Sequence, residues 1–490
     1  MHERVVRIAA WALRQVFGRT YHRYLTGLGR LETEQAHVLR RLILGLSRTQ
    51  YGVAFGLRPD DDYALFARKL PAAVFEDLEP WLNRQITGEK RVISAAAFVH
   101  IEPTSGSQGR RKSIPYTPAM MAAFSRMFAI WAHDLLSQTL RPATGKIFIS
   151  QSPQTSTRRE TQYLDGWLEK LLSPFLVRLK RCHSDFLMDV CITLLSEPDL
   201  EIISVWSPSY LTIVLDFITT HRTEIAAHLP PDRAGVLGHE INWRRVWPKL
   251  QLISCWDEAM ARPFAESLRR HFPGVPVLGK GLLATEAAIS VPILSSGGSL
   301  PLYDAVFYEF VDAAGVLFRL HQLKEGQTYE ILITTDSGLI RYRLGDLVQV
   351  TGFYRGAPVL RFEGRSGHVS DMVGEKLSDA FVREALLPLI PTGRFAVVPR
   401  MAARPNYVLI CESAGGLMND AEAALAQAHH YALARRQGQL GPLQVVEADH
   451  VPARLKDLAQ ARGQDFGHAK DTALISNPAQ AKAILDSLPL

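Results

Sequence analysis

The sequence predicts an α/β protein with a large N-terminal domain and a smaller α+β C-terminal domain. Its 490 residues exceed the ~250–300 residues at which a single hydrophobic core stops growing. Runs with helical and strand-like periodicity alternate over most of the chain, as expected of α/β layers. Residues 363–376, "EGRSGHVSDMVGEK", are polar and punctuated by glycine. We therefore predict a boundary there, with domains at 1–365 and 366–490.

In the large domain, the first part is expected to be helical and the last part β-rich. Residues 303–362 contain β-type runs separated by Gly, Asp and Ser, which predicts a meander or a small β-barrel beside the main sheets. The other predicted elements are helices within 1–90, a buried strand at 94–101, a helix at 119–136 after Pro118, and a strand at 145–150.

The C-terminal domain is predicted from three strand-like runs and one long helical run. The strands are expected at 394–401, 406–413 and 443–449. The helix is expected at 419–438, with Asn419 as its N-cap, Glu422 completing a capping box and Gly438 beyond its end. A unit of this size is expected to act as a mobile lid.

Composition narrows the class of protein and the compartment. The net charge is +6, but no long cationic tract is interleaved with aromatic residues, so nucleic-acid binding is not predicted. The four cysteines form no CxxC pair and no zinc-type grouping with histidine. A reducing, cytoplasmic compartment and a monomer are expected.

The N-terminal stretch "MHERVVRIAAWALRQVF" has the pattern of a basic amphipathic helix. Arg4, Arg7 and Arg14 lie among apolar residues. The apolar run from Ile8 to Leu13 is too short for a signal-peptide core or a membrane span. Two interpretations are open: the helix docks on its own domain, or it lies on a membrane surface.

The stretch "EPTSGSQGRRK", residues 102–112, has the chemistry of a phosphate-binding loop. Gly106 and Gly109 allow backbone N–H groups to converge on an anion. Thr104, Ser105 and Ser107 add hydroxyl donors, and Lys112 with its arginine neighbours adds positive charge. No Walker A pattern is present, and a polar surface turn is the competing interpretation.

Two acidic residues further along the chain also have two interpretations each. Glu286, in "KGLLATEAA", is suited to a magnesium ion that bridges phosphates, or is a solvated glutamate. Asp346, in "YRLGDLVQV", is suited to accepting hydrogen bonds from two ribose hydroxyls, or is an ordinary turn aspartate.

The order of these motifs resembles that of the adenylate-forming superfamily. Within it, the chain is similar to the auxin-responsive acyl-acid amido synthetases, the Gretchen Hagen family, and most of all to their compact bacterial members. The resemblance covers nearly the whole chain and extends to "ISVWSPSYL", "LISCWD", "YEFVD", "VSDMVGEKLS" and "RGQDFGHAK".

The resemblance implies a two-step reaction that uses ATP and Mg²⁺. A carboxylic acid is first adenylated, and an amine, expected to be an amino acid, then takes the acyl group and releases AMP. The implied phosphate loop is Thr104, Ser105, Gly106, Ser107, Gln108 and Gly109, followed by Lys112. The other implied site residues are Thr285 and Glu286 at nucleotide and metal, Tyr342 and Asp346 at adenosine, Arg365 at the hinge, and Lys470 as a mobile catalytic lysine.

The chain also departs from the family pattern. The phosphate loop of the family commonly reads S-S-G-T-S, whereas Ser107 and Gln108 end it here, and Ala284-Thr285 replaces two serines before Glu286. The acyl pocket is expected on the helix after the loop, at Met121, Phe124, Phe128 and Trp131, although such a stripe is also typical of a core. Two alternative functions remain: a thioester-forming ligase for coenzyme A or a carrier protein, and a non-catalytic nucleotide-binding relative.

Overall fold

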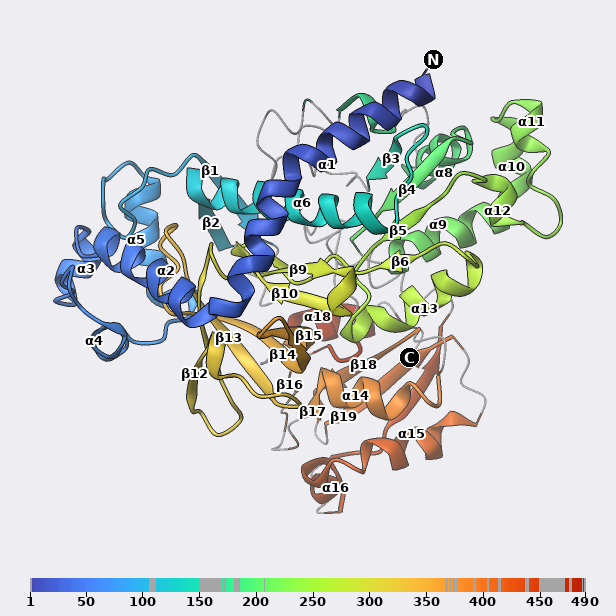
Figure 1. Cartoon of the computed structure of the whole chain (residues 1–490). Coiled ribbons are helices and arrows are strands. Elements are labelled where there is room, and N and C mark those ends of the chain that lie inside the picture. The colour runs from blue at the N-terminus through green and yellow to red at the C-terminus, as the bar shows by residue number, and fades with distance from the viewer. Residues whose placement is uncertain are drawn as a thin grey trace. The chain divides into compact units, whose positions relative to one another are not determined.

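The chain folds into two units, each of which has its own sheets and helices (Figure 1). In this computed structural model the first unit comprises 1–145, 159–175 and 280–363, and the second 146–158, 176–279 and 364–490. The structure describes residues 2–104, 112–149, 170, 173–179, 186–206, 208–365, 369–370, 372, 375, 377–390, 394–402, 405–412, 416–436, 440–448, 472–475, 478–486 and 488. One division between the units falls at 363/364, beside the predicted boundary, but 176–279 groups with the C-terminal part. The separation of 1–365 from 366–490 stays a prediction.

The first 90 residues are helical, as the sequence predicts. Side-chain caps start two of the helices: Thr49 accepts a hydrogen bond from the N–H of Gly52, and Asp62 from that of Leu65. The helices are α1 (His2–Gly27), α2 (Leu31–Leu46), α3 (Gln50–Ala54), α4 (Tyr63–Lys69) and α5 (Phe75–Ile86).

A seven-stranded sheet forms the centre of the first unit. Its strands follow the order β12-β11-β13-β14-β15-β10-β9. The strands are β9 (Ser290–Ile293), β10 (Gly298–Pro301), β11 (Phe307–Val311), β12 (Leu317–Arg319), β13 (Thr328–Thr334), β14 (Tyr342–Tyr354) and β15 (Ala357–Arg365). The pairings of β11 with β12 and β13, and of β13 with β14, are antiparallel. The β-rich texture of residues 303–362 is confirmed, but only β13, β14 and β15 follow one another as in a meander, because β12 lies outside β11.

Two short hairpins and one long helix complete the first unit. The hairpins are β1 (His100–Thr104) with β2 (Lys112–Tyr116), and β7 (Leu283–Ala284) with β8 (Ala287–Ala288). The strand predicted at 94–101 is wrong, because regular pairing begins only at His100. The helix α6 (Pro118–Gln138) follows β2 and packs beside α1.

The second unit begins with a four-stranded parallel sheet in the order β3-β4-β5-β6. Its core contains Trp247, Tyr210 and Phe272, all nearly inaccessible to solvent. The strands are β3 (Lys146–Ile149), β4 (Leu200–Ser204), β5 (Leu252–Ser254) and β6 (Val277–Leu278). The helices are α8 (Phe186–Leu195), α9 (Pro208–Thr220), α10 (Arg222–Ala227), α11 (Pro231–Ala234), α12 (Trp243–Val246) and α13 (Arg262–His271).

The C-terminal part of the second unit is the predicted α+β element, with one correction. The predicted helix at 419–438 is interrupted, because α15 (Leu417–Leu425) and α16 (His429–Arg436) are separate. Gly416 rather than Asn419 is the N-cap, and Glu422 instead accepts hydrogen bonds from the backbone of Leu443 and from Arg435. The other elements are β16 (Val369–Ser370), β17 (Leu377–Ser378), α14 (Asp379–Leu386), β18 (Phe395–Arg400), β19 (Asn406–Cys411), β20 (Gln444–Glu447) and α18 (Pro478–Asp486).

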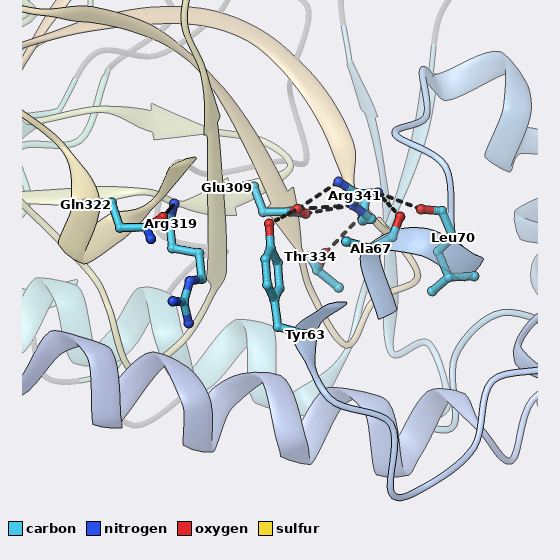
Figure 2. A network of polar contacts seen from close by, with 8 residues as sticks. All are labelled: Tyr63, Ala67, Leu70, Glu309, Arg319, Gln322, Thr334 and Arg341. Atoms are coloured by element: carbon cyan, nitrogen blue, oxygen red, sulfur yellow. Dashed lines mark hydrogen bonds and ion pairs between the residues drawn. The ribbon is translucent and has the colours of Figure 1, made fainter. Parts of the chain in front are cut away.

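A buried ion pair fixes the start of β14 (Figure 2). The Arg341 guanidinium donates to Glu309 from Nε at 2.9 Å and from Nη2 at 2.8 Å. Its Nη1 donates to the carbonyl oxygens of Ala67 and Leu70, each at 2.7 Å. The side chains are only 4% and 1% exposed. Tyr63 donates to the same carboxylate, and burial, with Glu309 beside it, raises the pKa of Tyr63 to about 12.

Replacement of Arg341 by methionine is expected to reduce the free energy of unfolding by about 3–5 kcal/mol, because it leaves the Glu309 charge buried without its partner. Chemical denaturation monitored by circular dichroism measures this. The double variant Arg341→Met with Glu309→Leu should recover a large part of the loss. A single variant no less stable than the double one would contradict the interpretation.

The interface of α1 and α6 contains a neutral histidine. His133 stacks on Tyr21 with a centroid separation of 4.3 Å, and its Nδ1 has no hydrogen-bond partner among the described residues. Desolvation first, then His22 and Arg14, lowers the pKa of His133 below its usual 6.5. The unfolded chain therefore binds a proton here more readily, and stability is lost as the pH falls below about 6.5.

Replacing His133 with phenylalanine should keep the stacking contact and remove this titration. We expect the thermal midpoint of His133→Phe to fall less steeply than that of the parent protein as the pH is lowered from neutrality. His37→Gln, at an exposed position of α2 and not among the groups that shift the pKa of His133, is the control. Parallel pH profiles of the parent and His133→Phe would argue against a titrating role for His133.

Candidate active site

The β1–β2 hairpin frames the predicted phosphate loop. Thr104 is the last residue of β1 and Lys112 is the first residue of β2, and the two pair with each other. Ser105, Gly106, Ser107, Gln108 and Gly109 fall between them and lie outside the described residues. The structure therefore fixes where the chain enters and leaves this loop.

Lys112 connects the end of the loop to the start of β14. Its ammonium lies 3.3 Å from the Tyr342 hydroxyl, to which it donates. It also lies 5.4 Å from the ring centroid of Phe75 and 5.9 Å from that of Tyr342, within the range of cation–π attraction. Lys112 has no carboxylate partner among the described residues, so its charge is held by aromatic rings and remains available to an anion.

The other end of β2 is joined to the second predicted motif. The Tyr116 hydroxyl donates to the carbonyl oxygen of Thr285 at 2.8 Å, and the Tyr116 ring stacks on Phe124. Thr285 and Glu286 form the two-residue turn between β7 and β8, where Ala284 pairs with Ala287. Strand β2 therefore connects the three predicted motifs. It begins at Lys112, where the phosphate loop ends, and Lys112 contacts Tyr342 of the Asp346 motif. At its other end, Tyr116 contacts Thr285 of the Glu286 motif.

Glu286 is suited to a metal ion. Only 8% of the residue is exposed, and it has no hydrogen bond or ion pair with any other described residue. Its carboxylate oxygens are not among the fully enclosed polar atoms of the described residues, so they remain open to a ligand. Mg²⁺ is a hard cation that prefers oxygen ligands of this kind. The site residues thus fit Mg²⁺ at Glu286.

Asp346 lies inside a strand rather than in the turn that its sequence suggests. It belongs to β14 and is 2% exposed. The pairing register shifts between Glu330 and Leu332, and Gly345 has φ = 77°, so the glycine forms a bulge. Because the bulge preserves the alternation of faces, Tyr342 and Asp346 are both buried, whereas Arg343 is exposed.

Of the two remaining predicted site residues, the structure describes the backbone of Arg365 but not Lys470. Arg365 is the last residue of β15. Lys470 lies outside the described residues. Further along the chain, Ile475 donates a hydrogen bond to Val397 of β18, and Val397 donates one to Ala473.

The predicted acyl-pocket residues all lie on α6. Phe124 is buried in the core of the first unit, and Met121 and Trp131 pack against that core. Phe128 packs with Phe17 and Ala129. These contacts are those of core residues, and the pocket assignment stays a prediction.

Sequence reasoning missed the residues that tie the motifs together. Phe75, Tyr116 and Arg341 carry no motif of their own, and their partners are distant in sequence. Lys112 was selected for its charge, but its contact with Tyr342 spans 230 positions and has no local signal.

Comparison with solved structures defines the class of fold. The chain is similar to the AtGH3.15 acyl acid amido synthetase in complex with 2,4-DB, with a TM-score of 0.82, 20% identity and coverage of 96% of each chain. It is less similar to 2-hydroxyisobutyryl-CoA ligase in the postadenylation state, with a TM-score of 0.58, 15% identity and coverage of 94% and 90%. The fold is that of the adenylate-forming enzymes.

Sequence comparison identifies the family. The GH3 family N-terminal domain matches residues 28–230 and the GH3 family central domain matches residues 299–365. The chain belongs to the GH3 family, which confirms the resemblance drawn from the motifs.

Relatives include indole-3-acetic acid-amido synthetase GH3.3 of Arabidopsis thaliana, 21% identical over 72% of this chain and 70% of the relative. Another is jasmonoyl–L-amino acid synthetase JAR6 of Nicotiana attenuata, 22% identical over 68% and 69%.

The bulge before Asp346 can be tested with a matched pair of glycines. Gly345 and Gly326 have φ of 77° and 78°, so alanine at either position should reduce the free energy of unfolding by about 1–2 kcal/mol. Only Gly345→Ala is expected to weaken ATP binding as well, because it displaces Asp346. Calorimetric titration with ATP and denaturation measure the two effects. Equal ATP affinity in both variants would remove the bulge from the site.

Proposed function

We propose that this protein is an ATP-dependent acid–amino acid ligase. It joins a carboxylic acid to ATP, forming an acyl-adenylate and pyrophosphate. The amino group of an amino acid then attacks the acyl carbon, which forms an amide and releases AMP. Membership of the GH3 family and the fold of adenylate-forming enzymes support this function.

The observation that carries the proposal is the attachment of β2 at both ends. Lys112 contacts Tyr342, and Tyr116 contacts Thr285, so the loop end, the turn with Glu286 and the strand with Asp346 belong to one assembly. A polar surface turn would not require an aromatic cage around its terminal lysine. A nucleotide site does require a cation, a metal ligand and a buried acceptor in one place.

The roles proposed for the residues follow from their chemistry. The loop from Thr104 to Gly109 would bind the phosphates, with Lys112 adding charge. Asp346 would accept hydrogen bonds from the ribose, with Tyr342 beside the adenosine. Glu286 would hold Mg²⁺, which when bound offsets negative charge on the phosphate oxygens. Arg365 is proposed at the hinge, and Lys470 as the cation that stabilises the charge developing at the α-phosphate.

The substrates are proposed by class. The named acids of the relatives, indole-3-acetic and jasmonic, and the 2,4-DB of the solved complex combine an apolar body with one carboxylate. We expect an acid of this kind, bound near Met121, Phe124, Phe128 and Trp131, and an amino acid as acceptor. Cys191, Cys255 and Cys411 are buried and form no disulfide among the described residues, which suits a reducing compartment, and we propose a cytoplasmic monomer.

The test is mass spectrometry of reactions that contain the protein, ATP, Mg²⁺, a library of carboxylic acids and the twenty amino acids. An amide mass together with AMP is expected. Coenzyme A is included in a parallel reaction, and a thioester without an amide would replace the proposal by thioester formation. The absence of AMP with every acid would favour a non-catalytic nucleotide-binding protein.

Replacing Asp346 with alanine is expected to weaken ATP binding by more than about tenfold, equivalent to ~1.4 kcal/mol, because charge-assisted hydrogen bonds are lost. Calorimetric titration with ATP measures the affinity. Asp312→Asn, which alters a carboxylate in a turn of the same unit, should leave the affinity unchanged. An unchanged affinity in Asp346→Ala would exclude Asp346 from the nucleotide site.

A further inference from the structure

The N-terminal helix α1 has an apolar face that the described residues of the first unit leave exposed. Val5, Ile8, Trp11 and Val16 are 59%, 65%, 63% and 63% exposed. They are four of the thirteen large hydrophobic residues that are exposed in the described part of the chain, and they fall within one short stretch of helix. Isolated exposed apolar residues are common, but a cluster of this kind marks a contact surface.

These four side chains are exposed although α1 is packed against the first unit. The opposite face of α1 packs against α6, beside which it runs in Figure 1. Phe17 is 3% exposed, and the Tyr21 hydroxyl donates to Asp134 at 2.8 Å. Ile8 and Phe17 are about two and a half helical turns apart, which places them on opposite sides of the helix. The orientation is therefore fixed, with one apolar face inward and another outward.

Positive charge surrounds the outward face. Arg4, Arg7, Arg14 and Arg19 are all exposed. Glu3 is the single acidic residue of α1, and it pairs with Arg7 at 2.6 Å. Arg4 and Arg19 border the apolar residues along the helix, while Arg7 and Arg14 extend the charge on the side of Trp11.

We propose that α1 is a binding surface for an anionic membrane. The helix would lie in the plane of the interface, with Val5, Ile8 and Val16 among the upper acyl carbons and Trp11 at the headgroup level. The surrounding arginines would contact acidic headgroups. The described residues contain no helix long and apolar enough to cross a membrane, and a helix that lies on the surface needs no such length.

Charge favours a membrane over a second copy of the chain. A symmetric dimer through this face would bring the same patch of each copy together, and would set four arginines against four arginines. An anionic surface complements that charge, and its apolar interior accepts the four exposed side chains.

The experiment is co-sedimentation of the full chain with two kinds of vesicle: phosphatidylcholine alone, and phosphatidylcholine mixed with phosphatidylglycerol. We expect at least about tenfold stronger binding to the anionic vesicles, weakened by added salt. The double variant Ile8→Ser with Trp11→Ser and the double variant Arg4→Gln with Arg19→Gln should each lose most of this binding.

Matched controls replace exposed apolar and exposed arginine residues outside α1. Val53→Ser removes an equally exposed apolar residue from α3, and Arg48→Gln with Arg270→Gln removes two exposed charges that are not part of α1. Both should bind as the parent protein does, and unchanged thermal midpoints show that the variants are folded. Equal binding to both vesicles, or binding that survives the α1 variants, would overturn the proposal. A dimer in vesicle-free solution that the Ile8 and Trp11 changes abolish would also overturn it, in favour of a second copy.

Discussion

The ion pair of Arg341 and Glu309 is the interaction from which the geometry of the candidate site follows. A buried charge is tolerated only when its hydrogen-bonding groups are satisfied, and Arg341 reaches Glu309 and two carbonyl oxygens at once. It also holds Arg341 at φ = 44°, a backbone conformation that costs free energy. The end of α4 is thereby fixed to β11 and to the residue that precedes Tyr342.

This ion pair also positions the residues around Lys112. Next to this pair, Ala73 exchanges backbone hydrogen bonds with Arg341 and Arg343, so the segment after α4 lies along the start of β14. That places Phe75 where, together with Tyr342, it surrounds the Lys112 ammonium. The phosphate loop therefore ends at Lys112, whose ring contacts depend on residues that lie next to a buried ion pair.

The sequence predicts the kinds of element and the motifs better than it predicts how they meet. Helices in the first 90 residues and the β-rich texture of residues 303–362 follow from periodicity and turn residues, and the motif order identifies the family. Asp346 was expected beside a turn, because a glycine in "YRLGD" does not reveal whether it ends a strand or bulges within one. The helix predicted at 419–438 is two helices, and Glu422, expected in a capping box, instead accepts a hydrogen bond from the backbone of Leu443, a contact with no local signal.

In the candidate site the charges of Lys112 and Glu286 are not paired with each other. Lys112 lies near the rings of Phe75 and Tyr342, and Glu286 is buried in a hairpin turn without a described partner. Strand β2 begins at Lys112 and contacts the turn that holds Glu286, yet the two charges form no ion pair. If these charges served stability alone, an ion pair between them would be the less costly arrangement. Placing them on two separate hairpins, β1–β2 and β7–β8, leaves the cation for an anion and the carboxylate for a metal ion. A nucleoside triphosphate with bound Mg²⁺ carries both an anion for Lys112 and a metal ion for Glu286. The separation of the two charges therefore supports a nucleotide site.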